Sequence, residues 1–215
     1  MSDEQIRAVA WDLTSDDIKV QKNACKVIRE YGGKAAKTLL EVAHEWDVHD
    51  QNRLLNKQTY NRYLESIELL IDDSEAIGIL KETLSDPNPL FRSFAVRALS
   101  HIYDSCIPEL LRFAYYDENA DVRIEAISAL GRLGDKESHN TIVKALNDPV
   151  DGVRLRAIRE MRHIAGTEGV NILIKMLHDP SKWVAYKVIS TLRRLYAEEA
   201  IEPIIGLLDS KDIDI

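Results

Sequence analysis

The stretch that decides the fold is residues 117–135, which read DENADVRIEAISALGRLGD. The short acidic and amide side chains at its start suit a helix N-terminus, because they accept hydrogen bonds from the unpaired amides of the first turn. Val122, Ala126 and Leu130 then recur at helical spacing, and Gly134 marks the expected end. The pattern predicts a helix with one apolar face.

This unit recurs with a fixed step of 31 residues. The aspartates that keep the step are Asp86, Asp117, Asp148 and Asp179, and one apolar set that keeps it is Val96, Ile127, Ile158 and Ile189. Asp-Pro pairs at three of the turns separate the units, because proline disfavours a helical residue before it. A constant period of this size is typical of a stacked repeat array, in which each unit buries its apolar face against its neighbours.

The sequence therefore predicts an all-α solenoid of about six helix pairs, with residues 1–215 as a single domain. The expected units are a first pair at 16–30 and 34–45 joined by Gly32-Gly33, an irregular second repeat with an insertion around 46–73, and regular repeats at 84–208. A second helix follows the first within each repeat, and Ile142, Ala145 and Leu146 are its apolar residues in the unit that begins at Asp117.

The layout resembles the HEAT-like repeats of the phycobilisome-lyase type. The residues that carry the resemblance are Asp121-Val122-Arg123, Ala126 and the run 129–135, with partial repeats at Asp148, Arg154 and Ala157 and at Asp86, Arg92 and Ala95. The resemblance implies a right-handed α-α superhelix with one row of helices outside and one row inside. It covers nearly the whole chain, most clearly from residue 84 to residue 208.

The resemblance also implies that the arginine of each repeat pairs with the turn aspartate of a neighbouring repeat. The expected structural ladder consists of Asp86, Arg92, Asp117, Arg123, Asp148, Arg154 and Asp179. At the next step the arginine is replaced by Ala185, so Asp179 is expected to lack an equivalent partner.

Composition favours some partners over others. The chain has 28 Lys and Arg against 36 Asp and Glu, a net charge of −8, which disfavours nucleic acid and favours a neutral or basic protein or peptide. No apolar run approaches the length of a membrane span, and no signal peptide is visible at the N-terminus. The two cysteines stand far apart outside any metal-binding spacing, so we expect a cytoplasmic protein.

Two groups of residues are candidates for a partner site. The first lies in the irregular repeat and consists of Trp46, Tyr60 and Tyr63, because aromatic residues are enriched where proteins meet and insertions in solenoids often lie on the binding face. The second lies on the second helices of the repeats, which we expect to form the inner row, and consists of Asn140, Lys144, Asn171 and Lys175.

The ligand-type side chains of residues 44–50 are the densest such cluster. His44 and His49 are five residues apart, which does not match the four-residue spacing of a zinc-protease helix, although a loop could still bring oxygen and nitrogen ligands together. Deoxyhypusine hydroxylase resembles this repeat type and uses His-Glu pairs after the Val-Arg position, but Ser93-Phe94, Ile124-Glu125 and Leu155-Arg156 stand there. We therefore expect no catalytic residues, metal or cofactor.

These observations predict a non-enzymatic scaffold that binds a protein or peptide on its inner helix row. A lyase or metal-dependent hydroxylase is the first alternative, and a nucleic-acid-binding protein with a positively charged concave surface is the second. A terminal repeat has no neighbour to cover it, so the apolar residues of the last helix predict one of three arrangements: an end-to-end dimer through the C-terminal repeat, a tail folded over the end, or a fragment of a longer protein. These residues are Ile201, Ile204, Ile205, Leu207 and Leu208.

Overall fold

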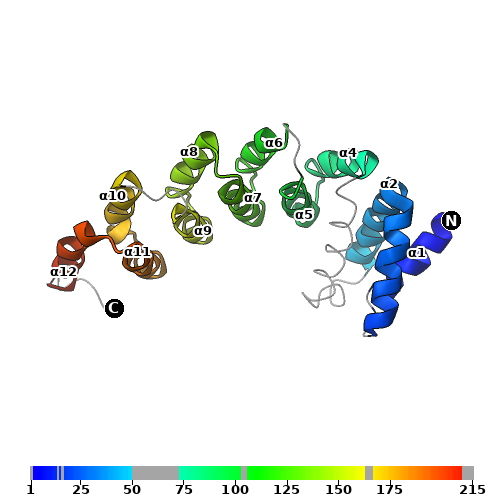
Figure 1. The fold of residues 1–215 in the computed structure, drawn as a ribbon, viewed down its shortest axis with the longest axis horizontal. Coiled ribbons are helices and arrows are strands. Elements are labelled where there is room, and N and C mark those ends of the chain that lie inside the picture. Colours follow the sequence, from blue (N-terminus) through cyan, green and yellow to red (C-terminus); the bar gives the residue numbers. More distant parts are fainter. Residues whose placement is uncertain are drawn as a thin grey trace. The chain divides into compact units, whose positions relative to one another are not determined.

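Helices account for all the regular secondary structure of the described residues, as expected for a repeat of helix pairs (Figure 1). The computed structural model describes residues 2–49 except 14 and 16, residues 73–102, residues 106–162 and residues 167–209. Packing divides the chain into two units, Met1–Ile107 and Pro108–Ile215. The predicted all-α solenoid of paired helices is confirmed.

The first unit contains an N-terminal helix, a long broken helix and two shorter helices. Its helices are α1 (Asp3–Asp12), α2 (Ile18–His49), α4 (Ser74–Thr83) and α5 (Pro89–Leu99). The Ser2 hydroxyl accepts from the Gln5 N–H while the Gln5 side chain accepts from the Ser2 N–H, which satisfies amides at the start of α1. Helix α2 breaks at Gly32, whose φ of 53° is left-handed, so the predicted break between two helices is confirmed.

The second unit contains the regular repeats that follow α5. Its elements are α6 (Ile107–Ala114), α7 (Ala120–Leu133), α8 (Lys136–Ala145), α9 (Asp151–Met161), α10 (Thr167–Lys175), the short 3-10 helix η1 (Met176–His178), α11 (Lys182–Arg194), the short 3-10 helix η2 (Glu198–Ala200) and α12 (Ile201–Asp209). None of the described helices combines the length and the apolar character that crossing a lipid bilayer requires.

Helix α7 shows why this sequence forms this repeat. The Asn119 side chain accepts from the N–H groups of Asp121 and Val122, which caps the helix start. At the other end Gly134 has a φ of 66° and donates its N–H to the carbonyl of Leu130. The buried residues of α7 are Val122, Ala126, Ile127, Ala129 and Leu130. The helix therefore begins, ends and buries its apolar face as the spacing predicts.

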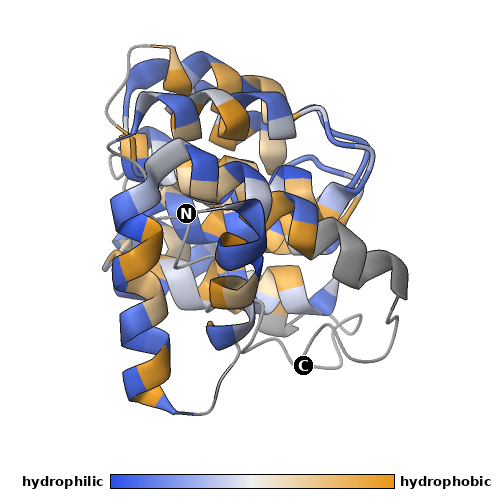
Figure 2. Ribbon diagram, turned by 90° about the vertical axis from the view of Figure 1, so that its right-hand side faces the viewer, coloured by the Kyte–Doolittle hydropathy of each residue, from blue (hydrophilic) through white to orange (hydrophobic). Residues whose placement is uncertain are grey.

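Each repeat buries apolar residues from both of its helices. Hydrophobic and hydrophilic residues alternate around the turns of the helices, so every repeat has an apolar face to cover (Figure 2). In the second unit this core includes Ile127, Leu130, Ile142, Ile158, Leu173, Val188 and Leu192. A core of this kind continues from one repeat to the next, because no repeat can cover its own apolar face.

Within the second unit the helices form two rows, and the unit curves around the first helices of its repeats (Figure 1). Helices α7, α9 and α11 lie on the inside of this curve, where α7 packs on α9 and α9 packs on α11. Helices α6, α8, α10 and α12 lie on the outside. The prediction that the second helices form the inner row is therefore wrong for this unit. The inner row packs helix directly on helix, which draws its helices together and leaves the second helices on the wider side.

Candidate interaction surface

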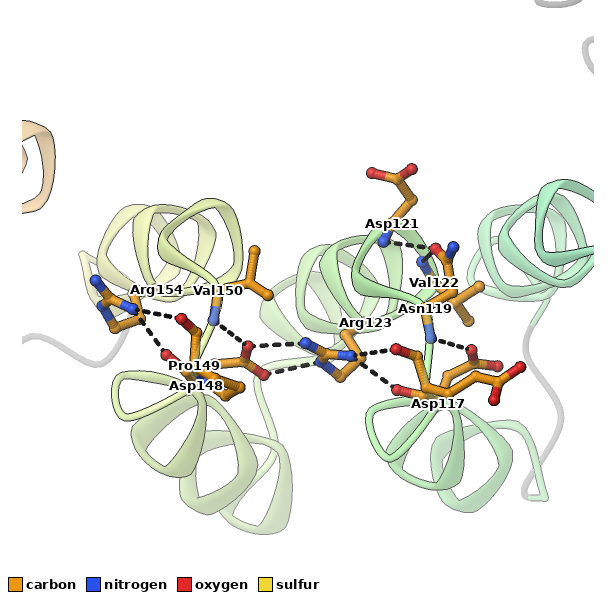
Figure 3. Close-up of polar contacts among 10 residues, drawn as sticks. Asp117, Asn119, Asp121, Val122, Arg123, Asp148, Pro149, Val150 and Arg154 are labelled. Atoms are coloured by element: carbon orange, nitrogen blue, oxygen red, sulfur yellow. Dashed lines mark hydrogen bonds and ion pairs between the residues drawn. The ribbon is translucent and has the colours of Figure 1, made fainter. Parts of the chain in front are cut away.

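The turns between helices are joined by an arginine that bridges two repeats (Figure 3). Arg123 donates through Nε and Nη2 to the two carboxylate oxygens of Asp148, at 2.8 and 2.9 Å. Its Nη1 donates to the backbone carbonyls of Asp117 and Glu118, at 2.9 and 3.0 Å. One guanidinium thus fixes the turn of its own repeat and the turn of the following repeat, and its planar fork suits this geometry.

Arg154 makes the same contacts one repeat later. It donates to both carboxylate oxygens of Asp179 at 2.9 Å and to the carbonyls of Asp148 and Pro149 at 2.9 and 3.3 Å. The prediction that Asp179 lacks a partner is therefore wrong, because each of these aspartates pairs with the arginine of the preceding repeat. Replacement of the next arginine by Ala185 leaves Asp179 paired.

The ladder aspartates also cap their own turns. Each accepts at Oδ1 from the N–H two residues ahead, in the pairs Asp86–Asn88, Asp117–Asn119, Asp148–Val150 and Asp179–Ser181. The hydrogen bond to Asp148 is the main reason that the pKa of Arg123 is raised. Burial, followed by the Asp148 charge, raises the pKa of the Tyr115 phenol. Arg123 and Arg154 each donate four hydrogen bonds and each is paired with a carboxylate, so neither is an unpaired cation that could hold an anionic ligand.

A second polar cluster caps α8. Asp135 accepts from the N–H groups of Glu137 and Ser138 and from the Ser138 hydroxyl, and the Arg112 guanidinium lies 3.7 Å away. Burial acts to raise the pKa of Asp135, but the hydrogen bonds from Ser138 and Glu137 and the positive charge of Arg112 together lower it below its ordinary value. The carboxylate form is therefore favoured at this helix start.

The predicted binding residues of the second helices are all exposed. Asn140 and Lys144 lie on α8, and Asn171 and Lys175 lie on α10. Helices α8 and α10 belong to the outer row (Figure 1), so these four exposed residues are not on the inner row, where they were predicted to lie.

The remaining predicted residues lie where the structure gives no side-chain contacts. Tyr60 and Tyr63 are outside the described residues, and Trp46 belongs to α2 without a described side chain. The cluster at 44–50 falls in the same part of the chain. Among the described residues, no three His, Cys, Asp or Glu side chains are grouped so that they could hold a metal ion.

The inner row of the second unit carries residues that were not among the predicted binding residues. Helices α7, α9 and α11 together contain nine Lys or Arg and four Asp or Glu, whereas the outer helices α6, α8, α10 and α12 contain four and five. On α11, Trp183 and Tyr186 are 75% and 64% exposed. The 31-residue period could have identified Trp183 as a candidate binding residue. It aligns Trp183 with Gly152, which indicates that the stacking of repeats does not require a tryptophan at this position.

An apolar cavity of about 430 Å³ lies between α11 and α12. Its lining includes Ile189, Leu192, Tyr196, Ile201 and Ile204. Tyr196 has a φ of 52°, in the left-handed region that Gly134 occupies two periods earlier, and its side chain is almost wholly exposed. A side chain with a β-carbon pays for this conformation with roughly 1–2 kcal/mol. The last repeat therefore presents a strained aromatic residue beside an apolar hollow.

Comparison with known proteins identifies the repeat. A family model of HEAT repeats matches residues 77–154 and 140–215. Among solved structures, the YibA protein of Escherichia coli is similar over 97% of this chain and 74% of its own, with 17% identity and a TM-score of 0.57. This similarity supports the fold alone.

Two further structures are more distant. A designed armadillo repeat protein in complex with the peptide (KR)4 has 16% identity, coverage of 89% and 99%, and a TM-score of 0.46. Human deoxyhypusine hydroxylase in complex with glycerol has 16% identity, coverage of 91% and 97%, and a TM-score of 0.44. Neither likeness is close enough to support an inference about function. No curated protein matches the chain.

Proposed function

Because this chain belongs to the HEAT-repeat family, we propose that it is a non-enzymatic scaffold that binds a protein or peptide on its inner helix row. The observation that carries the proposal is the composition of that row in the second unit. Its helix α11 presents Trp183 and Tyr186 to solvent, and these residue types dominate the energetics of protein interfaces. The polar ladder does not compete for this role, since its arginines and aspartates bind one another.

The proposal is tested by affinity capture with the whole chain as bait. The comparison uses a variant with Trp183→Ala and Tyr186→Ala and an outer-row control with Lys144→Ala and Lys175→Ala, all at exposed positions. We expect one protein from source-cell lysate to be retained near stoichiometry by the wild type and the control and to be lost with the inner-row variant. Retention that depends only on the outer pair would favour the surface of Asn140, Lys144, Asn171 and Lys175 instead.

The same purified chain tests the enzyme alternative. Stoichiometric iron or zinc would favour a metal-dependent enzyme and direct attention to residues 44–50. We propose instead that the protein has no metal centre. Failure of every bait to retain a protein would contradict the scaffold.

Two finer assignments belong to this proposal. The run Asp121-Val122-Arg123 and its repeats support the phycobilisome-lyase subtype of HEAT-like repeat. The two solitary cysteines, which are not in a disulfide, support a cytoplasmic location. Fractionation of the source cells would test the second assignment directly.

We also propose that a second copy contacts the last repeat. The support is the apolar cavity between α11 and α12 together with the exposed side chains of Tyr196, Ile201 and Ile205. Sedimentation velocity should report a dimer for the wild type and a monomer for Ile201→Glu. Ile18→Glu, at an exposed position on α2, is the control and should leave the dimer intact. A monomeric wild type at all concentrations would contradict this contact.

A further inference from the structure

The exposed face of α11 forms one continuous stripe. Trp183, Tyr186, Ser190, Arg193 and Arg194 follow one another at intervals of three or four residues and at the helix end, so they lie on one side of the helix. The opposite side of α11 is buried, with Val184, Val188, Thr191 and Leu192 in the core. The stripe is therefore turned away from the repeat stack, on the inner row of the second unit.

The preceding helix of the inner row extends this stripe. Helix α9 packs against α11, and its positions equivalent to Trp183, Tyr186 and Ser190 are Gly152, Leu155 and Arg159. Arg159 is exposed. We define Arg159, Trp183, Tyr186, Lys187, Arg193 and Arg194 as the α9–α11 patch.

The aromatic residues of the patch are not required for stacking. Gly152 occupies the position of Trp183 one repeat earlier, where an added β-carbon would lie 3.4 Å from the Ile124 side chain. The repeat therefore stacks with no side chain at this position. Trp183 and Tyr186 nevertheless keep most of their surface in water, which leaves a large apolar area for a partner to bury.

Most cations of the patch lie on a helix that contains no carboxylate. Helix α11 contains four Lys or Arg and no Asp or Glu. In the part of the chain that the structure describes, Arg159, Lys187, Arg193 and Arg194 form no ion pair. In contrast, Arg123 and Arg154 of the ladder are each bound to an aspartate. A partner that approaches the patch meets unneutralised positive charge beside two exposed aromatic rings.

The charge around the patch limits the size of the anion that fits. Directly after α11 the chain carries Glu198, Glu199 and Glu202, and α7 carries Asp121 and Glu125. Exposed charges act over roughly 8 Å at physiological ionic strength. A long phosphate backbone, with one charge per about 1.7 Å of duplex, would extend beyond the cations and meet these carboxylates. A short acidic segment with an apolar side chain would remain within the patch.

We propose that the α9–α11 patch binds an acidic peptide segment of a partner protein, with an apolar or aromatic side chain of that segment against Trp183 and Tyr186. This inference rests on the proposed scaffold function and names the chemistry of its partner. It reverses the expectation of a neutral or basic partner, because the local charge of the inner row differs in sign from the whole-chain charge of −8.

The experiment is selection of a phage-displayed random peptide library on the whole chain, followed by fluorescence anisotropy with synthetic copies of the selected peptides. The variants are Trp183→Ala and the pair Arg159→Glu with Arg194→Glu. The control is the pair Lys144→Glu with Lys175→Glu, which changes the net charge equally on the outer row. A single-stranded oligodeoxynucleotide is measured in parallel, and circular dichroism verifies that each variant is folded.

We expect the selected peptides to combine acidic and apolar residues, and their dissociation constants to rise about tenfold or more with either patch variant. The control should change them by less than about twofold, and added salt should weaken binding.

Peptides that are neutral or basic, or that bind both patch variants normally, would overturn the inference while leaving the scaffold function intact. Failure to select any peptide would count against both. Oligodeoxynucleotide binding that is tighter than peptide binding and is lost with the arginine variant would assign the patch to nucleic acid and overturn the proposal.

Discussion

Removal of Arg154 should destabilise the repeat stack more than an ordinary surface substitution does. Its guanidinium makes two bonds of 2.9 Å to Asp179 and two bonds to backbone carbonyls. The two side chains are only 11% and 7% exposed. Loss of one partner of such a pair leaves the other buried and uncompensated, which costs about 3–5 kcal/mol. We therefore expect Arg154→Ala to lower the free energy of unfolding by about this amount.

The pairwise share of this loss is measured by a double-mutant cycle with Asp179→Ala. Arg154 keeps its carbonyl contacts in the second variant, so Asp179→Ala should cost less than Arg154→Ala. The double variant should cost less than the sum, with a coupling energy of about 1–3 kcal/mol. Urea unfolding followed by far-UV circular dichroism gives all four free energies.

An exposed ion pair in the same unit provides the matched control. Arg112 lies 3.0 Å from Glu137, with side chains 25% and 71% exposed, and its coupling should not exceed about 1 kcal/mol. A coupling for Arg154 and Asp179 no larger than that of this control, or a loss below about 1 kcal/mol for Arg154→Ala, would refute the view that the ladder holds neighbouring repeats together.

Three further predictions concern the second unit. The pKa of Asp135 is lowered in the folded state. Its contribution to the free energy of unfolding is therefore present above the unfolded pKa of about 4 and is lost as the pH falls through the folded pKa. Asp135→Asn should remove this dependence, so that stability measured by urea unfolding falls less steeply at acidic pH. Tyr196→Gly should raise the free energy of unfolding by about 0.5–1 kcal/mol, since it relieves a left-handed conformation at an exposed side chain; a loss of stability would assign the ring a packing role. Ile127→Ala should cost about 2–5 kcal/mol in chemical denaturation, because Ile127 is fully buried, and a cost near zero would contradict its place in the core.

The 31-residue period predicted the fold from the sequence, but it could not predict which arginine pairs with which aspartate. Arg123 stands six residues after Asp117 and 25 residues before Asp148, and both intervals recur for Arg92 and Arg154. In a periodic sequence both sequence separations between arginine and aspartate recur together, so the sequence alone does not favour one pairing over the other. In the structure one guanidinium contacts both turns: Nη1 donates to the carbonyl of Asp117 in its own turn, and Nε and Nη2 donate to the carboxylate of Asp148 in the next turn.

The identity of the inner row was equally hidden. Both helices of a repeat have one apolar face, so amphipathicity places each of them against the stack and does not say which row lies on the inside of the curve. Curvature follows from how closely neighbouring helices approach within each row, which depends on many side-chain volumes together. A local signal was nevertheless present, since Gly131 lies against the Glu160 side chain of the next inner helix and Gly152 lies near Ile124. Small residues at these contacts allow close approach in the inner row.

The whole-chain charge and the charge of the inner row lead to opposite expectations about the partner. A partner responds to charges within about one screening length, so the sum over 215 residues matters less than the sum over the face it meets. Assignment of residues to rows separates a positive inner row from a slightly negative outer row. Arg123 and Arg154 are excluded from the charge that a partner can bind, because each is already paired with an aspartate of the ladder. The charge that remains available is concentrated on α9 and α11, beside the exposed aromatic residues, and this coincidence of charge and apolar area points to the α9–α11 patch as the binding surface.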